Sequence, residues 1–271
     1  MDALADFIDL ERYPIDDLDS PVGRSLIESC QGMMREQAIC ALKGFLRPVL
    51  LQAISDEVTH LESTMRRVDF PATPYGWLKN AGFSTSHPRS RVFDRRCGVL
   101  TRDQLDPEGL CVRLFQFPEL TEFVRQLLGY EQLFNSACPN ISVRLNIMEP
   151  GDEFGWHYDT NDGAVSLVLQ SAEEGGDFEY APLIRSEEEE NYDRVGAIFS
   201  GEETPDVADA PPGTFILFMG RRSLHRVAPI GRSRRSRQTL LFSYDRQPGM
   251  VFPEKIRKRM LEPSREPFLG Q

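Results

Sequence analysis

The chain has 271 residues, with 31 Lys and Arg against 42 Asp and Glu, and its formal net charge is -11. Hydrophobic residues make up 40% of it, which excludes intrinsic disorder. No apolar run approaches the roughly 18 residues that a membrane span needs. The acidic start of the chain lacks the features of a secretory signal. A charge this negative argues against a protein whose main task is to coat nucleic acid.

The five cysteines are scattered along the chain, without a C-x-x-C pair. A disulfide framework or a zinc ribbon would space its cysteines differently. We therefore expect buried, reduced thiols in a cytoplasmic protein that has neither a membrane nor a nucleic-acid partner.

The N-terminal region, residues 1–137, is predicted to contain helices and a long loop. Ser20 and Pro21 suit the N-cap and first position of a helix, and apolar residues then recur at helical spacing. Residues 68–110 are rich in Pro, Gly, Asn and Ser, which predicts a loop that covers a site. A short amphipathic helix is expected over residues 118–128.

The pattern changes near residue 138, after which short apolar runs alternate with turn residues. The runs are residues 141–148, 164–170, 177–180, 214–219, 224–227 and 239–244. Many short strands with turns between them predict an α+β fold with a mainly β core, a sandwich or barrel with helices packed in front. We assign the core to residues 138–245 and a C-terminal tail to residues 246–271, within a single domain. The basic stretch 255–261 is expected to be a solvated helix or tail.

Two of the four histidines lie in this β-rich region and suggest a metal site. His157 and Asp159 form an H-x-D triplet, so on a strand both point to one face. His225 lies in a later predicted strand. Two histidines and one carboxylate form the facial triad of non-haem Fe(II) oxygenases, which leaves positions open for cosubstrate and O2. An isolated H-x-D triplet is a weak signal, because polar residues are common at strand ends.

Polar residues near the predicted triad suggest a cosubstrate site. A strand beginning near Arg235 would place Arg235, Arg237 and Thr239 on one face. A buried guanidinium there could hold a carboxylate in a bidentate way, which fits a dicarboxylic cosubstrate that also chelates the metal. Arg237 is preferred because it leads directly into an apolar run, and Asn146 is a further candidate for contact with the cosubstrate. The alternative is that this arginine-rich segment is a solvated basic patch.

Candidates for substrate contact are Arg89, Trp156 and Tyr158. Arg89 belongs to the predicted covering loop, which would close over the site as a lid and could place its guanidinium on an amino-acid carboxylate. Trp156 and Tyr158 flank His157, although an aromatic residue in such a position often packs in the core instead.

Residues 139–245 resemble the double-stranded β-helix, a jelly-roll or cupin-like fold, of the Fe(II)- and 2-oxoglutarate-dependent dioxygenases. Longer stretches are similar to the bacterial family named for the free-amino-acid halogenases HalD and BesD. They include His87-Pro-Arg, Asn146-Ile-Met-Glu-Pro-Gly-Asp-Glu-Phe-Gly-Trp-His-Tyr-Asp and Gly220-Arg-Arg-Ser-Leu-His-Arg-Val-Ala-Pro. Halogenases of this family carry Gly where this chain carries Asp159, so the resemblance implies a hydroxylase-type member.

The resemblance implies that Fe(II), 2-oxoglutarate and O2 are the cofactors and that Arg237 or Arg235, with Thr239, binds the cosubstrate. The expected reaction is hydroxylation of an unactivated C–H bond of a free amino acid or a natural-product intermediate, with 2-oxoglutarate converted to succinate. Three alternatives remain: a desaturase on the same scaffold, an AlkB-like demethylase of nucleic acid and a non-enzymatic binding protein. In AlkB-type members a Tyr stands where this chain has Met148.

Overall fold

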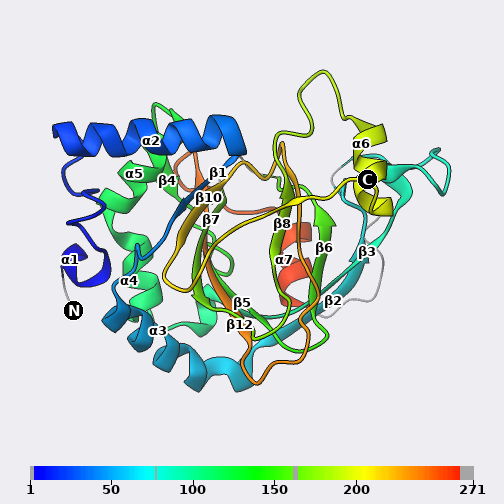
Figure 1. Ribbon diagram of the computed structural model, residues 1–271. Coiled ribbons are helices and arrows are strands. Elements are labelled where there is room, and N and C mark those ends of the chain that lie inside the picture. Colours follow the sequence, from blue (N-terminus) through cyan, green and yellow to red (C-terminus); the bar gives the residue numbers. More distant parts are fainter. Residues whose placement is uncertain (1–2, 77, 161–163, 263–271) are drawn as a thin grey trace.

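The computed structural model describes residues 3–76, 78–160 and 164–262. Its centre is an eleven-stranded sheet with the strand order β1-β10-β7-β12-β5-β3-β6-β11-β8-β9, in which β2 pairs with β3. Figure 1 shows this sheet curled into two facing layers. β3 joins the layers, because residues 98–101 pair with β5 and residues 95–96 pair with β6. The expected double-stranded β-helix with a mainly β core is confirmed.

The strands of this sheet are β1 (Ile39–Leu42), β2 (Arg66–Ala72), β3 (Phe93–Thr101), β5 (Val143–Met148), β6 (Glu153–His157), β7 (Ala164–Gln170), β8 (Phe178–Ala181), β9 (Asp206–Val207), β10 (Phe215–Phe218), β11 (Leu224–Val227) and β12 (Arg237–Phe242). A separate pair consists of β4 (Phe134–Asn135) and β13 (Tyr244–Asp245). The α-helices are α1 (Leu4–Phe7), α2 (Pro21–Gln37), α3 (Pro48–Leu61), α4 (Leu110–Gln116), α5 (Pro118–Leu128), α6 (Tyr192–Ser200) and α7 (Glu254–Leu261).

The N-terminal helices cover the outer face of the larger layer, as predicted (Figure 1). α2 begins where the sequence indicated, since the Ser20 side chain accepts a hydrogen bond of 3.0 Å from the Gly23 amide. Alternate residues of β5, Val143, Leu145 and Ile147, point into this apolar core. Their burial removes the outer sheet face from water, so the polar residues between them point inward.

The register of β5 with β12 sets the positions of these inward residues. Thr239 lies opposite Asn146, and Leu241 lies opposite Arg144. Side chains on a strand alternate between faces, so Arg237 shares the inner face with Thr239. The inner face therefore carries one arginine toward each end of the β5–β12 pair, Arg237 near one and Arg144 near the other.

Two expectations about the flanking regions are wrong. The predicted covering loop is a loop only in part, because β2 and β3 form an antiparallel hairpin that pairs Arg66 with Val99 and Ala72 with Phe93. Pro71 and the charged residues hid these strands in the sequence, whereas pairing within the sheet satisfies their backbone. The basic stretch 255–261 forms a helix, α7, which was one of the two forms expected, but the expected full solvation is wrong, because one side of α7 packs against β2 and lines a pocket.

All five cysteines are buried and free, as expected from their spacing. Among the described residues, no helix is long and apolar enough to cross a membrane.

Candidate metal centre and adjoining pocket

Three predicted ligands converge on one point inside the curled sheet. His157 ends β6 and lies directly opposite His225 of β11 in the strand pairing, and their ring centroids are 4.0 Å apart. Asp159 Oδ1 lies 3.9 Å from Nε2 of His157 and 3.6 Å from Nε2 of His225. All three candidate ligand atoms lie within 4.8 Å of one another, so small side-chain rotations suffice to bring them onto one metal ion.

Backbone carbonyls orient both imidazoles. Nδ1 of His157 donates to the carbonyl of Gly155, and Nδ1 of His225 donates to the carbonyl of Ser223, each at 2.9 Å. This leaves Nε2 of each ring unprotonated in the neutral form and directed at the shared point. Burial lowers the pKa of His157 well below its ordinary value, and the neighbouring His225 adds to this effect. The neutral imidazole, which is the form that binds metals, is therefore favoured.

Asp159 supplies the negative charge of the site. Burial by itself raises the pKa of this carboxyl, but His225, Arg144 and Arg95 outweigh it and hold the pKa below its ordinary value. Its amide donates to the carbonyl of Gly220 at 3.0 Å. A Cβ atom at Gly220 would lie 2.0 Å from Asp159 Oδ2, so this carboxylate position requires glycine at residue 220. Sequence reasoning did not identify that role of Gly220.

The structure distinguishes between the two candidate cosubstrate arginines. Arg235 lies exposed in the turn before β12, whereas Arg237 begins β12 on its inner face. The guanidinium of Arg237 donates to Thr239 Oγ1 at 2.7 Å. Burial lowers the pKa of Arg237 to about 10, and the nearby Asp177 only partly opposes this. Within the described part of the chain, no ion pair joins Arg237 to a carboxylate, so its buried charge calls for an anionic ligand.

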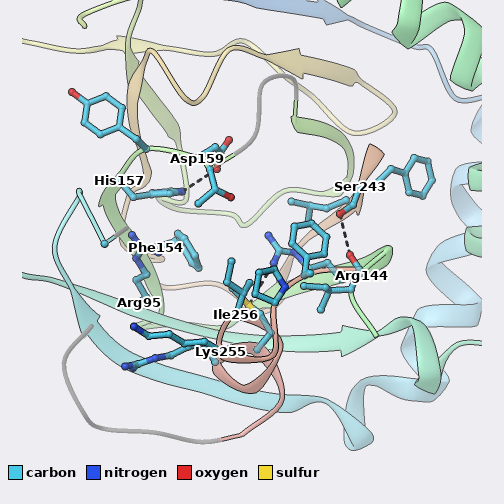
Figure 2. Close-up of a pocket in the computed structure, with 18 of the residues that line it drawn as sticks. Arg95, Arg144, Phe154, His157, Asp159, Ser243, Lys255 and Ile256 are labelled. Carbon is cyan, nitrogen blue, oxygen red and sulfur yellow. Dashed lines mark hydrogen bonds and ion pairs between the residues drawn. The ribbon is translucent and has the colours of Figure 1, made fainter. Parts of the chain in front are cut away.

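A pocket of about 400 Å³ adjoins the metal ligands (Figure 2). Its apolar walls come from several elements and include Phe70, Phe154, Val165, Leu241, Phe252, Ile256 and Met260. The volume and the mixture of apolar walls with a few charged groups are typical of a small-molecule site. His157 and Asp159 border this pocket, so a molecule inside it lies next to the candidate metal position.

Four basic side chains, Arg95, Arg144, Lys255 and Arg259, also line this pocket, and none of them was predicted as a site residue. Arg95 lies opposite Phe154 in the pairing of β3 with β6, and its guanidinium stacks 5.1 Å from the centroid of that ring. The neighbouring Arg96 instead pairs with Glu153 at 2.7 Å. Because side chains alternate along β3, Arg95 points into the pocket and Arg96 points away from it. The two arginines can be told apart only when the position of β3 is known.

Arg95 and Arg144 are half-buried cations without a carboxylate ion pair among the described residues. The Nε atom of Arg95 is buried and makes no hydrogen bond. Burial lowers the pKa of Arg95 to about 10 and also lowers that of Arg144. A guanidinium that is removed from water and left unpaired is costly, which indicates that both side chains are placed to receive an anion.

The three predicted substrate residues lie in different surroundings. Arg89 donates to Asn80 Oδ1 and to the carbonyl of Lys79, and it is not among the residues that line the pocket. Trp156 is buried in an apolar cluster on the other side of β6, with the Arg226 guanidinium 4.8 Å from its ring centroid. Tyr158 alone reaches the pocket wall.

Two histidines and one carboxylate at one end of a curled β-sheet define the class of facial-triad non-haem iron oxygenases. The chain matches the family described as Halogenase D, HalD, over residues 22–250. Because this match covers most of its length, the chain belongs to the HalD family.

Solved structures share the fold at low identity. An oxidoreductase of the 2OG-Fe(II) oxygenase family from Burkholderia pseudomallei is 16% identical with a TM-score of 0.52, covering 82% of this chain and 92% of its own. AviO1 from Streptomyces viridochromogenes Tue57 is 15% identical with a TM-score of 0.55, covering 83% and 97%. The nogalamycin epimerase SnoN, solved with Fe3+ and alpha ketoglutarate, is 12% identical with a TM-score of 0.55, covering 82% and 84%.

The comparison with curated proteins gave no match. The predicted recognition of a HalD-like member of the Fe(II)/2-oxoglutarate oxygenases is confirmed. The predicted cofactors of this class, Fe(II), 2-oxoglutarate and O2, are confirmed with it, and the His157, Asp159 and His225 side chains form a donor set that suits iron.

Proposed function

We propose that this oxygenase hydroxylates an unactivated C–H bond of a small molecule that carries a carboxylate, such as a free amino acid. The observation that carries the proposal is the complete His157, Asp159 and His225 set beside a cation-lined pocket. Halogenases of the family carry Gly at the position of Asp159, which frees a coordination site for halide. Here Asp159 fills that site, which favours transfer of oxygen over chlorine.

His157, Asp159 and His225 would hold the iron, and Arg237 would hold the distal carboxylate of 2-oxoglutarate. Arg237 suits this task because its guanidinium donates to Thr239 Oγ1. This hydrogen bond orients the guanidinium for bidentate binding of a carboxylate. Asn146 lies opposite Thr239 on the same inner face and would contact the cosubstrate between iron and Arg237. When bound, iron with 2-oxoglutarate and O2 supplies the oxidising chemistry, which releases CO2 and succinate and places one oxygen atom on the substrate.

The pocket would orient the substrate and exclude water. Arg95 is the best-placed anchor for a substrate carboxylate, since it stacks on Phe154, whose ring centroid lies 4.8 Å from that of His157. A carboxylate held there would fix one end of a small molecule beside the metal ligands. The apolar walls would exclude water from the C–H bond that reacts. Tyr158 would add one wall of this space.

A nucleic-acid substrate fits the molecule less well. The arginine-rich segment before β12 is divided among separate contacts, with Arg226 paired with Glu179 at 2.7 Å and Arg235 exposed in a turn. The whole chain carries a net charge of -11, which argues against binding to the phosphate backbone of a nucleic acid. We therefore favour a small-molecule substrate.

The test supplies the enzyme with Fe(II) and 2-oxoglutarate without oxygen, then adds O2 and a panel of free amino acids. Succinate and product mass are measured together, in chloride buffer. We expect one amino acid to gain a single oxygen atom, and this product to vanish in Asp159→Ala. A product that gains chlorine would overturn the assignment of Asp159, and a product that loses two hydrogens would identify a desaturase. If neither succinate nor bound iron were detected, the proposal that this protein is an oxygenase would be overturned.

A further inference from the structure

The C-terminal helix α7 forms one wall of the pocket and brings two cations to it. Lys255, Ile256, Arg259 and Met260 line the pocket, at positions that share one face of a helix. Figure 2 shows Lys255 and Ile256 of this helix beneath the same space that Arg95, His157 and Asp159 border. The helix lies more than 90 residues beyond His157 in the chain, so only the fold brings it here.

Arg144 links this helix to the sheet. Its guanidinium contacts the thioether of Met260 at 3.4 Å, and no ion pair joins it to a carboxylate in the part of the chain that the structure describes. A thioether is a weak acceptor and satisfies little of a guanidinium's hydrogen-bonding capacity. Arg144 therefore keeps donors available toward the pocket, at the side that α7 covers.

The charge of the pocket is opposite to that of the chain. Among the described lining residues, four carry a positive charge and only Asp159, a candidate iron ligand, carries a negative one. The whole chain carries a net charge of -11. Lys255 and Arg259 add to the positive potential here whatever other contacts they make at the surface. With one substrate carboxylate at Arg95, the single charge of Asp159 compensates only part of the positive potential around Arg144.

We propose that the substrate is dianionic: an amino acid whose side chain ends in a second oxyanion, held by Arg144 beneath α7. This deepens the proposed function and rests on it, because Arg95 takes the first carboxylate. The second oxyanion is a carboxylate or a phosphate, since a guanidinium binds either in the same bidentate way. A cationic side chain such as that of lysine would meet Arg144, Lys255 and Arg259 and be repelled.

Equilibrium binding to the anaerobic Fe(II) enzyme, saturated with 2-oxoglutarate, tests this inference. The probes are L-glutamate, O-phospho-L-serine, L-glutamine and L-lysine, measured by titration calorimetry. L-Glutamine has nearly the shape of L-glutamate without its side-chain charge. We expect at least one acidic probe to bind about tenfold or more tightly than L-glutamine, with L-lysine weakest. The tighter of the two acidic probes distinguishes a carboxylate from a phosphate.

Arg144→Gln should weaken binding of the acidic probes more than binding of L-glutamine and so remove this preference. Arg235→Gln, which removes an exposed arginine outside the pocket, is the matched control and should keep the preference. The proposal is overturned if neither acidic probe binds, if L-glutamine or L-lysine binds as tightly as the acidic probes, or if Arg144→Gln leaves the preference intact.

The visible charge-transfer absorption of iron-bound 2-oxoglutarate separates this failure from that of the proposed function. If that absorption forms but acidic probes show no advantage, only the second subsite is wrong. If the absorption does not form in the wild-type protein, the proposed cosubstrate site fails, and the substrate inference falls with it.

Discussion

The two ends of the inner β5–β12 face carry similar arginines in different surroundings. Arg237 belongs to a strand of the central sheet, and Thr239, two residues along the same strand, fixes its guanidinium. Arg144 lies opposite Leu241 toward the other end, where its guanidinium contacts the thioether of Met260 of α7. Both are half-buried and have no carboxylate ion pair among the described residues.

This difference suggests that the two arginines suit different ligands, one constant and one variable. A guanidinium fixed by its own strand suits a ligand that every turnover uses, such as the cosubstrate. The surroundings of Arg144 depend on the side chains of the short helix α7, so substitutions in that helix would alter what this guanidinium can bind. Under the proposed function, the Arg237 end would serve the common cosubstrate and the Arg144 end would select the substrate.

Loss of a metal ligand should abolish turnover whichever arginine is intact, and it has the largest expected effect. In His225→Ala, Fe(II) affinity should fall more than a hundredfold, because even loss of an outer hydrogen-bond partner of a ligand costs about 10- to 100-fold. Anaerobic Fe(II) titration measures this directly. His60→Ala, an exposed change on α3, is the control and should bind iron like the wild type. Equal iron binding by both variants would contradict the assigned metal centre.

Arg237→Gln should affect only the cosubstrate end. The KM for 2-oxoglutarate should rise about thirtyfold or more, since truncating one partner of a buried charge pair costs about 2–5 kcal/mol. Iron affinity should stay unchanged. The unfolding temperature without ligand should not fall, because the variant removes an uncompensated buried charge. Arg235→Gln is the matched control, and a similar rise in its KM would contradict the assignment of Arg237.

Gly220→Ala should have the smallest of these effects and act through Asp159. The added methyl group would occupy the position of the Asp159 carboxylate, which lies 2.0 Å from a Cβ built there. Iron affinity should fall about tenfold, as for other changes that act on a ligand from outside. Gly196→Ala on α6 meets no atom within 4 Å and should leave iron affinity unchanged. Equal iron binding by both variants would show that Asp159 tolerates displacement.

The metal centre could be predicted because its signals are local. The H-x-D triplet is visible as residue types close together in the sequence, and the distal His225 lies on another recognisable strand. Asp159 itself lies beyond the end of β6, where its amide donates to the carbonyl of Gly220. Helices α2 and α5 were also predictable from a capping residue and an apolar period. For the helices, interactions within a few residues determine the outcome.

The pocket could not be predicted from these signals. Arg95 lies in a charged run that resembles surface, and the segment becomes a strand only because β2 and β5 pair with it. The basic residues of α7 likewise resemble a solvated tail, yet half of the helix lines the pocket. Neither segment has an apolar period strong enough to indicate burial, because charged residues share its inward face with apolar ones.

The sequence by itself determined the ligand chemistry and the mainly β core, since both follow from residue type and short-range periodicity. The tertiary structure alone decided which arginines lose contact with water and which remain on the surface. That outcome depends on pairing between β3 and β6 and on the docking of α7, contacts between segments that are far apart in the chain. A charged side chain is informative about ligands only when its burial is known, because an exposed guanidinium needs no partner whereas a buried one does.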